Sequence, residues 1–557
     1  MKLIECVPNF SEGRDLEMID QIVDAIKSSG GVILDVDPGA DTNRTVVTFV
    51  ADEKTVINAA FAGIKKASEL IDMTKHKGAH ARMGATDVCP LIPISEISIE
   101  ECVKLSKELA EKVAKELNIS TYLYEHSAKD EYRKNLANIR AGEYEGLFEK
   151  VEQPKWIPDF ISENGVKHNK KSGSTVIGVR EFLIAYNINL NTTSTLIARK
   201  IANRIREKGY PSRDEFKKLI KVDGKKVYTP GLFKNVKAVG WYIEEYKRAQ
   251  ISINLTNFRV TPIYEVFDAV CKLANDFGVR VTGSELVGLI PKDAIYETGL
   301  HYLKKAKQPY GLSEKEIIET AVQSLGLREL ADFIPEEKII EYKVAKKREL
   351  VNMTILDFVD ELASKSPAPG GGSIAALSAS LSAGLTSMVA HLTLGKKKYK
   401  KYSKEMKEIS FKAQKLKEFF LDVIDEDTDS FNMLMDAFSL PKSNDLEKEN
   451  RLKAIENATK DATLIPFSVL EKIPELLELT QEVVLHGNQS ALSDGGVASL
   501  TANTAAYGAY YNVLINLQDI TDQSFIDDLK LKANSIIKSV DKKSKDIQVI
   551  ILDLLKK

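Results

Sequence analysis

A change of hydrophobic period near residue 335 is the feature that most constrains how this chain folds. Before it, runs with alternating apolar and polar residues are interleaved with runs in which apolar residues recur every three to four positions. These periods are typical of strands and amphipathic helices. After residue 352 only the helical period remains, for example over 403–438 and 530–555. The 557 residues therefore predict an α+β half followed by an all-α helical bundle.

The first half repeats one element order. The first round is expected to consist of strand 2–7, helix 16–29, strands 31–37 and 44–50, helix 53–71 and strand 86–93, with helix 97–117 and strand 120–125 added. The second round is expected to consist of strand 181–190, helix 193–208, hairpin strands 235–245 and 248–258, helix 263–277 and strand 279–285. This is the ferredoxin-like order β-α-β-β-α-β. We expect two such subdomains, 1–178 and 179–335, with a ligand cleft between them.

A charged segment separates the two halves. Nine of the fifteen residues from 336 to 350 are charged. This composition favours a solvated linker over 336–351; the frayed end of a helix is the alternative. Residues 352–557 then form the helical bundle. Two architectures in one chain suggest two activities, or one activity and an assembly domain.

The run from Ser366 to Gly395 contains no Asp, Glu, Lys or Arg. A membrane span needs about 20 apolar residues, so the run is long enough to be one. However, it is built largely from Ala, Ser, Thr and Gly, which allow helices to approach each other closely. We therefore expect a helix buried in the bundle and no membrane contact, and close helix packing between subunits of a homo-oligomer.

The composition excludes some classes of partner and compartment. Lys plus Arg number 78 and Asp plus Glu number 80, so the net charge of −2 gives no overall field for nucleic acid. The four cysteines show no metal-ligand or disulfide spacing, which is typical of packing residues in a reducing compartment. The first ten residues contain no apolar signal region. A cytoplasmic location is expected.

Two of the seven histidines, His76 and His80, lie four apart in the basic, glycine-containing stretch HKGAHARMGATD. A zinc pair on a helix is one interpretation, but Gly78 lies between them and the basic neighbours would repel a dication. Surface or supporting histidines are a second interpretation. A general acid/base is the third, because imidazole transfers protons near neutral pH and basic neighbours lower its pKa. No metal site is expected.

Polar residues also cluster at two turns upstream. In LDVDPGADTNRTVV, Asp37 can orient a histidine and Arg44 can bind a carboxylate in a two-point contact. In ECVPNFSEGR, Asn9 lies in a segment that suits a substrate loop. Ordinary Asp/Asn/Gly turns and a helix N-cap are the alternatives.

Longer stretches resemble a known family. ECVPNFSEGR, DTNRTVVTFV, IDMTKHKGAHARMGATDVCPLIPI, IRAGEYEGL, VREFLIAYNINLNT and GSELVGLIP are similar to glutamate formiminotransferase. SPAPGGGSIAALSASLSAGLTSMV, GNQSALSDGGVAS and AYYNVLINLQDITD are similar to the formiminotetrahydrofolate cyclodeaminase/cyclohydrolase domain. Together they resemble the bifunctional formimidoyltransferase-cyclodeaminase family over nearly the full length. The resemblance implies transfer of a formimino group from N-formimino-L-glutamate to tetrahydrofolate, a co-substrate, then ring closure to 5,10-methenyltetrahydrofolate with loss of ammonia.

The resemblance also assigns residues of the transferase half. The family's catalytic histidine falls on His80, while His76 receives no role beyond shaping the loop. Arg44 and Arg82 are expected to bind the two carboxylates of formiminoglutamate, with Asn9 in the substrate loop and Asp37 in support. The folate-binding stretch falls on 161–173, with contacts expected at Gly165, Ser172 and Gly173. This chain has a few extra residues there, and Ala81 replaces a proline of the family.

In the helical half, the family's catalytic carboxylate falls on Asp427. On a helix, Asp422, Asp425 and Asp429 share a face and Asp427 points elsewhere. A solvated acidic face is the alternative; a buried carboxyl with a raised pKa can protonate the departing amine. Gly371, Gly372 and Ser373 are expected to bind folate at a helix N-terminus, unless SPAPGGGS is a plain loop. The basic run 396–401 is a solvated turn or a site for the folate's glutamate tail.

Two other functions stay open at this point. The helical half can instead be a methenyltetrahydrofolate cyclohydrolase, which shares the PAPGGGS type of domain. The whole chain can also be a non-catalytic folate-binding or scaffolding protein. The bifunctional enzyme is the preferred hypothesis, because the product of the transferase reaction is the substrate of the cyclodeaminase reaction.

Overall fold

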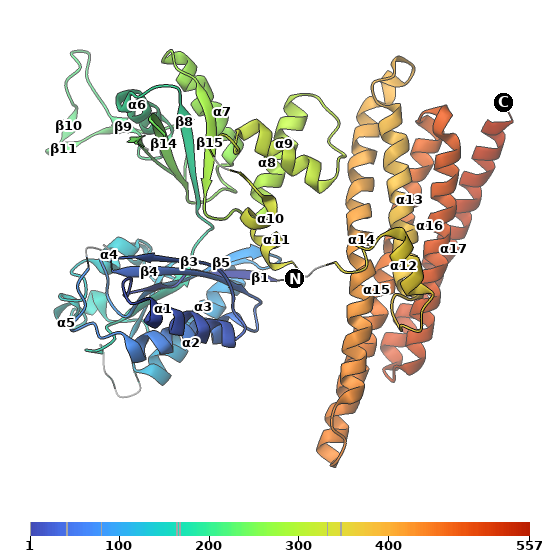
Figure 1. Ribbon diagram of the computed structural model, residues 1–557, viewed down its shortest axis with the longest axis horizontal. Coiled ribbons are helices and arrows are strands. Elements are labelled where there is room, and N and C mark those ends of the chain that lie inside the picture. Colours follow the sequence, from blue (N-terminus) through green and yellow to red (C-terminus); the bar gives the residue numbers. More distant parts are fainter. Residues whose placement is uncertain are drawn as a thin grey trace. The chain divides into compact units, whose positions relative to one another are not determined.

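The computed structural model describes residues 2–40, 43–78, 81–162, 165, 169–244, 246–330, 332–345 and 348–556. Its contacts divide the chain into two compact units. The first comprises residues 1–298 and 322–345, and the second comprises residues 299–321 and 346–557. The first contains two sheets with helices and the second is helical (Figure 1), which confirms an α+β half followed by an all-α half.

The first sheet has seven strands, in the order β3-β4-β1-β5-β7-β6, with β2 also between β4 and β5. They are β1 (Leu3–Cys6), β2 (Asn9–Phe10), β3 (Val32–Gly39), β4 (Arg44–Ala51), β5 (Thr86–Ser95), β6 (Thr121–Glu125) and β7 (Thr175–Val179). Strand β7 pairs in parallel with β5 and β6, and the other pairs are antiparallel.

Three helices cover one face of this sheet: α1 (Leu16–Ser28), α2 (Val56–Leu70) and α3 (Ile99–Leu117). Their apolar residues recur at helical spacing and pack with alternate strand residues around Ile26, Phe49 and Leu91. A smaller cluster around Tyr122 and Val176 includes residues of the short helices α4 (Leu136–Arg140) and α5 (Leu147–Lys150). Helices α1–α3 therefore leave the other face of the sheet to these shorter elements.

The second sheet has the antiparallel order β13-β14-β8-β15. Its strands are β8 (Ile184–Leu190), β13 (Val236–Ile243), β14 (Arg248–Leu255) and β15 (Val281–Val287). Helices α6 (Thr195–Ile205) and α7 (Ile263–Asp276) contact these strands (Figure 1). In β8 the buried apolar residues Ile184, Tyr186, Ile188 and Leu190 alternate with the polar Asn187 and Asn189. The helices pack on the apolar face.

Short strands follow α6: β9 (Tyr210–Pro211) pairs with β12 (Tyr228–Thr229), and β10 (Lys221–Val222) with β11 (Lys225–Lys226). Helices α8 (Lys292–Lys305) and α9 (Glu314–Leu325) come after the second sheet.

The segment expected to be a solvated linker is folded, so that prediction is wrong for most of it. Residues 335–344 form the short helices α10 (Pro335–Lys338) and α11 (Ile340–Val344). Ile339 and Ile340 between the charges are fully buried, and Lys343 donates to the backbone oxygen of Leu34 at 2.9 Å. Two buried isoleucines anchor this segment although it is rich in charge. This is compatible with burial of its backbone, because the long lysine and glutamate side chains still reach water or polar partners.

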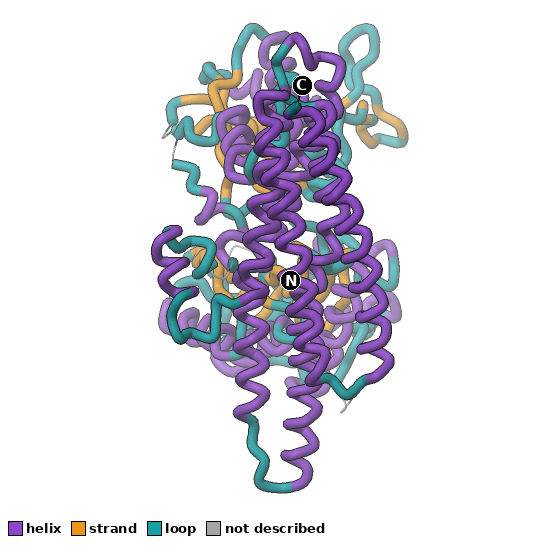
Figure 2. Tube along the Cα trace, turned by 90° about the vertical axis from the view of Figure 1, so that its right-hand side faces the viewer, coloured by secondary structure: helices purple, strands orange, loops and turns teal. Residues whose placement is uncertain are grey.

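The second unit is a bundle of long helices (Figure 2). After α12 (Ile355–Leu362) come α13 (Gly371–Thr393), α14 (Ser403–Ser439), α15 (Asp445–His486), α16 (Leu492–Asn516) and α17 (Gln523–Leu555). Helix α13 contacts α14, α15 and α16. Of the described residues, it is the one helix long and apolar enough to cross a membrane, yet 61% of its most apolar window is buried in the protein. The expected buried helix is confirmed.

Candidate active sites

Strand register in the first sheet puts three of the predicted site residues on one face. Asn9 on β2 and Asp37 on β3 pair with Val46 of β4 from opposite sides. Paired residues point to the same face, and so does Arg44, two positions before Val46. Asn9 also pairs with Val88, which packs in the cluster that lies away from helices α1–α3. Asn9, Asp37 and Arg44 therefore share the face that those helices leave uncovered.

Charges of both signs alternate around Arg44. Burial lowers the pKa of Arg44 and Arg140 adds to this, while Asp87 and Asp37 raise it. Asp87 is fully buried and forms an ion pair with Arg140. It also accepts the backbone N–H of Met83 at 3.0 Å. The cluster can position an anionic substrate beside two guanidinium groups.

His76 holds the histidine loop in place through both ring nitrogens. Its Nε2 lies 3.0 Å from the backbone oxygen of Asn43, and its Nδ1 accepts from Arg82 Nε at 3.2 Å. These partners require the neutral tautomer with hydrogen on Nε2. The amide of Asn43 donates to the Lys77 oxygen and accepts the backbone N–H of Gly13. His76 is therefore a positioning residue, the role that the sequence left undefined.

The Arg82 guanidinium is paired with glutamates in this structure, so its expected role as a substrate clamp stays a prediction. Its guanidinium makes a two-point contact with Glu145, at 2.7 and 2.9 Å, and a third hydrogen bond to Glu143 at 2.9 Å. These contacts raise the pKa of Arg82, whose side chain is only 7% exposed. Because its donors are directed to these glutamates and to His76, Arg82 ties the histidine loop to the segment after α4.

His80 and Ala79 lie outside the described residues, so the assignment of His80 as the catalytic histidine stays a prediction. The described residues on either side of them, His76 and Arg82, are anchored as above. The expected link between Asp37 and a histidine likewise stays untested.

Two of the expected folate residues lie against the segment that follows the histidine loop. The backbone oxygen of Ser172 accepts from Ala85, and Ser174 donates to the oxygen of Met83. At Gly173, with φ of +70°, a Cβ would lie 2.1 Å from that oxygen, so only glycine fits. Gly165 also has a positive φ, of +69°, and donates to the oxygen of Ser162. The stretch between Gly165 and Asn169 lies outside the described residues.

In the bundle, the N-terminus of α13 receives the carboxylate of Asp427 from α14. Ser373 Oγ donates to Asp427 Oδ2 at 2.9 Å, and Ser373 is fully buried. A Cβ on Gly372 would lie 2.1 Å from Asp427 Oδ1, so the carboxylate needs glycine at this position. Asn512 of α16 lies against Gly371. Asp427, Gly371, Gly372 and Ser373 are thus brought together.

Burial raises the pKa of Asp427, and the hydrogen bonds from the Ser373 side chain and backbone offset part of this rise. Asp427 is half-buried, and its assignment as the catalytic carboxylate stays a prediction. Asp422 instead pairs with Arg348, and Asp425 accepts from the backbone of Leu350 at 2.9 Å. Asp422 and Asp425 therefore anchor the incoming chain, while Asp427 points to the glycines.

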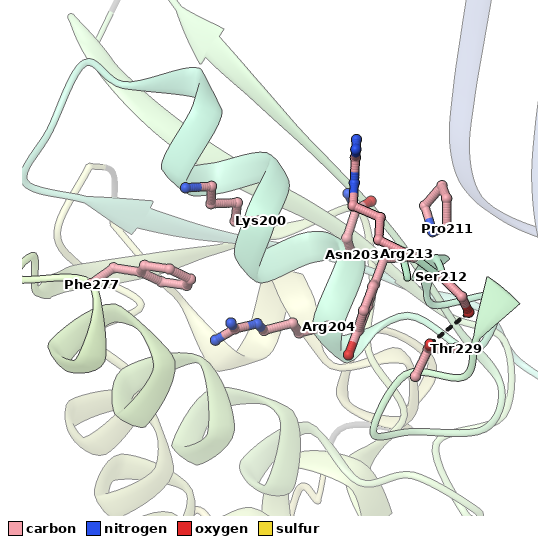
Figure 3. Close-up of a pocket in the computed structure, with 9 residues that line it drawn as sticks. Lys200, Asn203, Arg204, Pro211, Ser212, Arg213, Thr229 and Phe277 are labelled. Atoms are coloured by element: carbon pink, nitrogen blue, oxygen red, sulfur yellow. Dashed lines mark hydrogen bonds between the residues drawn. The ribbon is translucent and has the colours of Figure 1, made fainter. Parts of the chain in front are cut away.

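A cavity of about 630 Å³ lies elsewhere, on the helix side of the second sheet. Figure 3 shows Lys200 and Arg204 from α6, with Arg213, Ser212 and Phe277 around it. It contains no residue predicted for either site. Across the described part of the chain, no three His, Cys, Asp or Glu residues are grouped to hold a metal; since His80 falls outside that part, the expected lack of a metal stays a prediction.

Sequence reasoning missed several contributors. Glu143, Glu145 and Arg140 lie within the quoted stretch IRAGEYEGL, and Asp87 closes the histidine stretch. Asn512 lies in AYYNVLINLQD. The available signal was a stretch in which charged residues lie close to glycines. It did not reveal the partners of these residues, which are more than fifty positions away in sequence.

Comparison with known families defines the class of protein. The model of the formiminotransferase domain's N-terminal subdomain matches residues 3–180, and that of the formiminotransferase domain matches 185–345. The formiminotransferase-cyclodeaminase model matches 354–535. The chain therefore consists of a transferase region joined to a cyclodeaminase region. The site around Arg44 lies in the first region, and the site around Asp427 lies in the second.

Individual relatives agree with this class. Formimidoyltransferase-cyclodeaminase of Gallus gallus is 40% identical over 560 residues, covering 100% of this chain and 99% of the relative. Glutamate formimidoyltransferase of Thermoplasma acidophilum is 42% identical over 58% of this chain and 98% of its own. Methenyltetrahydrofolate cyclohydrolase of Methylorubrum extorquens is 38% identical over 32% of this chain and 85% of its own. The chain belongs to the formimidoyltransferase-cyclodeaminase family.

Proposed function

We propose that this enzyme transfers the formimino group of N-formimino-L-glutamate to N5 of tetrahydrofolate and then closes the ring to 5,10-methenyltetrahydrofolate, releasing ammonia. The observation that carries the proposal is the full-length match to formimidoyltransferase-cyclodeaminase, together with two separate candidate sites. The steps belong to histidine degradation and one-carbon folate metabolism.

In the first step, N5 of tetrahydrofolate attacks the amidine carbon of formiminoglutamate. The tetrahedral adduct then expels the amino nitrogen of glutamate. One imidazole can take the proton from N5 and return it to that nitrogen, and we assign this role to His80. Arg44, next to Arg140, binds the substrate carboxylates, and Asn9 lines the same face. Asp37 is assigned as a catalytic residue that orients the histidine. Arg82 and His76 hold the loop.

In the second step, N10 of 5-formiminotetrahydrofolate attacks the formimino carbon, and ammonia leaves. A carboxyl group with a raised pKa is protonated more readily and can give that proton to the departing nitrogen. We assign this role to Asp427. The backbone at Gly371, Gly372 and Ser373 begins helix α13 and binds the folate there, as Gly165, Ser172 and Gly173 do in the transferase half.

A second candidate function concerns the helical region alone. The methenyltetrahydrofolate cyclohydrolase relative matches this chain over 177 residues, so hydrolysis of the methenyl product is the second candidate activity of this region. Release of ammonia from 5-formiminotetrahydrofolate supports the cyclodeaminase. Consumption of methenyltetrahydrofolate by a protein that releases no ammonia from 5-formiminotetrahydrofolate supports the cyclohydrolase.

The remaining proposals concern architecture and assembly. The order β13-β14-β8-β15, and β3-β4-β1-β5 in the first sheet, support two ferredoxin-like subdomains. We also propose a cytoplasmic homo-oligomer, associating through the helical and transferase regions, with no resident metal, nucleic acid or membrane partner. Exposed apolar residues on α13 and α16 support the assembly: Leu381, Leu392, Val497 and Leu500.

Two substitutions test the assignment of the sites. We expect His80→Ala to abolish glutamate release and spare cyclisation of supplied 5-formiminotetrahydrofolate, and Asp427→Ala to do the reverse. An anaerobic assay that follows glutamate, ammonia and methenyl absorbance measures both steps. Wild-type protein without turnover, or full turnover in both variants, would contradict the proposal and favour a binding or scaffolding role.

A further inference from the structure

The cavity of about 630 Å³ on the helix side of the second sheet is positively charged. Its lining includes the cations Lys200, Arg204 and Arg213 and, among the described residues, no aspartate or glutamate. Within the described part of the chain, these three cations form no ion pair. A smaller cavity of about 350 Å³ beside α7 and α8 differs, because its Arg259 lies 3.9 Å from the carboxylate of Asp293. The charge of the larger cavity is therefore not compensated by the protein.

Helix α6 places two of these cations side by side. Lys200 and Arg204 are four residues apart, so they lie one turn apart on the same side of the helix, where like charges are slightly destabilising. The centre of the Phe277 ring lies 4.7 Å from Arg204 Cζ and 5.7 Å from Lys200 Nζ. Figure 3 shows both side chains extending from α6 to the side on which this ring lies. The ring attracts the two cations but cannot neutralise them.

The short ribbon of β9 and β12 forms another wall of the cavity and is held close to the end of α6. A Cβ on Gly209 would lie 1.8 Å from the Thr229 backbone oxygen, and a Cβ on Gly231 would lie 2.0 Å from the Arg206 backbone oxygen. Only glycine fits at these two positions. The ribbon carries two hydroxyl groups into the cavity lining, and Ser212 Oγ lies 2.8 Å from Thr229 Oγ1. The cavity is therefore a defined concave surface with both cations and hydroxyl groups.

Two acidic residues close to the cavity in sequence have their carboxylates engaged elsewhere. Glu207, just after α6, accepts the backbone N–H of Asn235 at 2.8 Å. Asp214 accepts the backbone N–H groups of Phe216 at 3.0 Å and Lys218 at 2.8 Å, within its own turn. These carboxylates stabilise local backbone structure, so the cations of the cavity remain available to an external anion.

The chemistry of the lining suits phosphate groups. A phosphate ester presents three acceptor oxygens and close to two negative charges on one group, so one such group can contact Lys200 and Arg204 together. A carboxylate has two oxygens and a single charge, and matches several cations and hydroxyl groups less well. The volume lies in the range of about 300–1,000 Å³ that is typical of small-molecule sites. Phe277 and Tyr210, which is 39% exposed, also offer aromatic surface to a planar ring.

We propose that this cavity binds a small compound with more than one phosphate group. Lys200, Arg204 and Arg213 hold its phosphates, and the hydroxyl groups of Ser212 and Thr229 bind further oxygens. Inorganic polyphosphate and nucleotides share this chemistry; a nucleotide adds a base that can lie against the aromatic surface. The cavity contains none of the residues assigned to formimino transfer or ring closure, so it is a third site, separate from the two substrate sites.

Calorimetric titration of the full-length protein with tripolyphosphate and with ATP, in magnesium-free buffer of low ionic strength, tests the proposal. We expect the double variant Lys200→Gln and Arg204→Gln to bind both compounds about ten- to a hundredfold more weakly, because charged hydrogen bonds are lost. The matched control is Lys538→Gln with Lys542→Gln, two exposed lysines with the same spacing on α17, which should bind within about twofold of wild type. Circular dichroism checks folding. If the double variant does not fold, Arg213→Gln gives the same comparison.

Comparison of ligands identifies the source of the phosphate. Tighter binding of ATP than of tripolyphosphate assigns a nucleotide, and equal binding assigns free polyphosphate; either result supports the proposal. Saturating 5-formyltetrahydrofolate should displace neither compound, because folate is expected at the other two sites. No binding by wild type, an equal loss in the control pair, or displacement by the folate would overturn the proposal. Tighter binding of a γ-linked tetraglutamate than of tripolyphosphate would also overturn it, since the cavity would then be a carboxylate site.

Discussion

At the scale of a single residue, burial in the fold changes the pKa of the Glu5 side chain. It lies in the middle strand β1, paired with Val50 and Ile92, and is 4% exposed. Burial raises its pKa to about 7, and the charge of Arg180 offsets part of the rise. Both neighbours in register are apolar, so the ionised carboxylate gains little to compensate for lost hydration.

Glu5 makes stability depend on pH in a defined direction. Its pKa is higher in the folded protein than in the unfolded chain, at about 4.3, so the folded protein binds the extra proton between these values. The contribution of Glu5 to the free energy of unfolding therefore falls as pH rises from about 4 to 7. We expect Glu5→Gln to stabilise the protein at pH 8 by on the order of 3 kcal/mol relative to its effect at pH 4. Urea unfolding of both proteins at the two pH values measures this, and an equal difference at both would contradict it.

At the scale of an element, the five-residue helix α4 is too short to be stable by itself. Lys150 holds its C-terminal end: Nζ donates to the backbone oxygens of Ile139 at 2.6 Å and Ala141 at 2.7 Å, and lies 4.1 Å from the ring centre of Trp156. Burial lowers the pKa of Lys150 to about 8. The helix carries Arg140, the partner of Asp87, so its stability affects the charge cluster of the transferase site.

We expect Lys150→Met to leave these carbonyl groups without their donor, at about 1–3 kcal/mol of local stability. Hydrogen exchange at residues 136–150 should become faster, and KM for formiminoglutamate should rise several-fold as Arg140 loses its support. Lys134→Met is the control, because the ion pair of that exposed lysine is with Glu131 one turn away and should matter little. Similar exchange in the two variants would show that Lys150 does not hold α4.

At the scale of the whole molecule, the bundle keeps apolar surface that its own helices do not cover. Leu381 of α13 and Leu500 of α16 are 54% and 52% exposed, on helices that contact each other. Large exposed apolar areas mark surfaces for association. The small residues of α13 serve the bundle itself, since Ala376, Ala379 and Ala383 are fully buried within it.

Light scattering should therefore give a mass that is a multiple of 61.9 kDa. We expect the double variant Leu381→Glu and Leu500→Glu to lower the mass while circular dichroism keeps its helical signal. Lys542→Glu, on α17, should leave the mass unchanged. A monomeric wild type at micromolar concentration would refute the proposed homo-oligomer.

The order of strands and helices followed from local information. Alternation in the sheets and the three-to-four spacing in the helices are set by each segment's own residues, so both halves and most of their elements could be predicted. Gly173 and Gly372 could be picked out in the sequence, but the reason why glycine is needed there could not. A Cβ would collide with the Met83 oxygen at the first position and with the Asp427 carboxylate at the second, and both atoms are far away in sequence.

Charged partners were decided by the tertiary structure alone. Arg82 and Arg44 look alike as sequence, yet packing commits Arg82 to Glu143 and Glu145 and leaves Arg44 on the uncovered sheet face. The charged segment after residue 335 folded because Ile339 and Ile340 are buried, with Ile339 bridged to Ile290 and helix α11 in contact with β3. The sequence by itself determined which elements form and which chemical groups are available. Only the tertiary structure decided which groups meet, because charges and hydrogen bonds act over a few ångströms in space, whatever the separation along the chain.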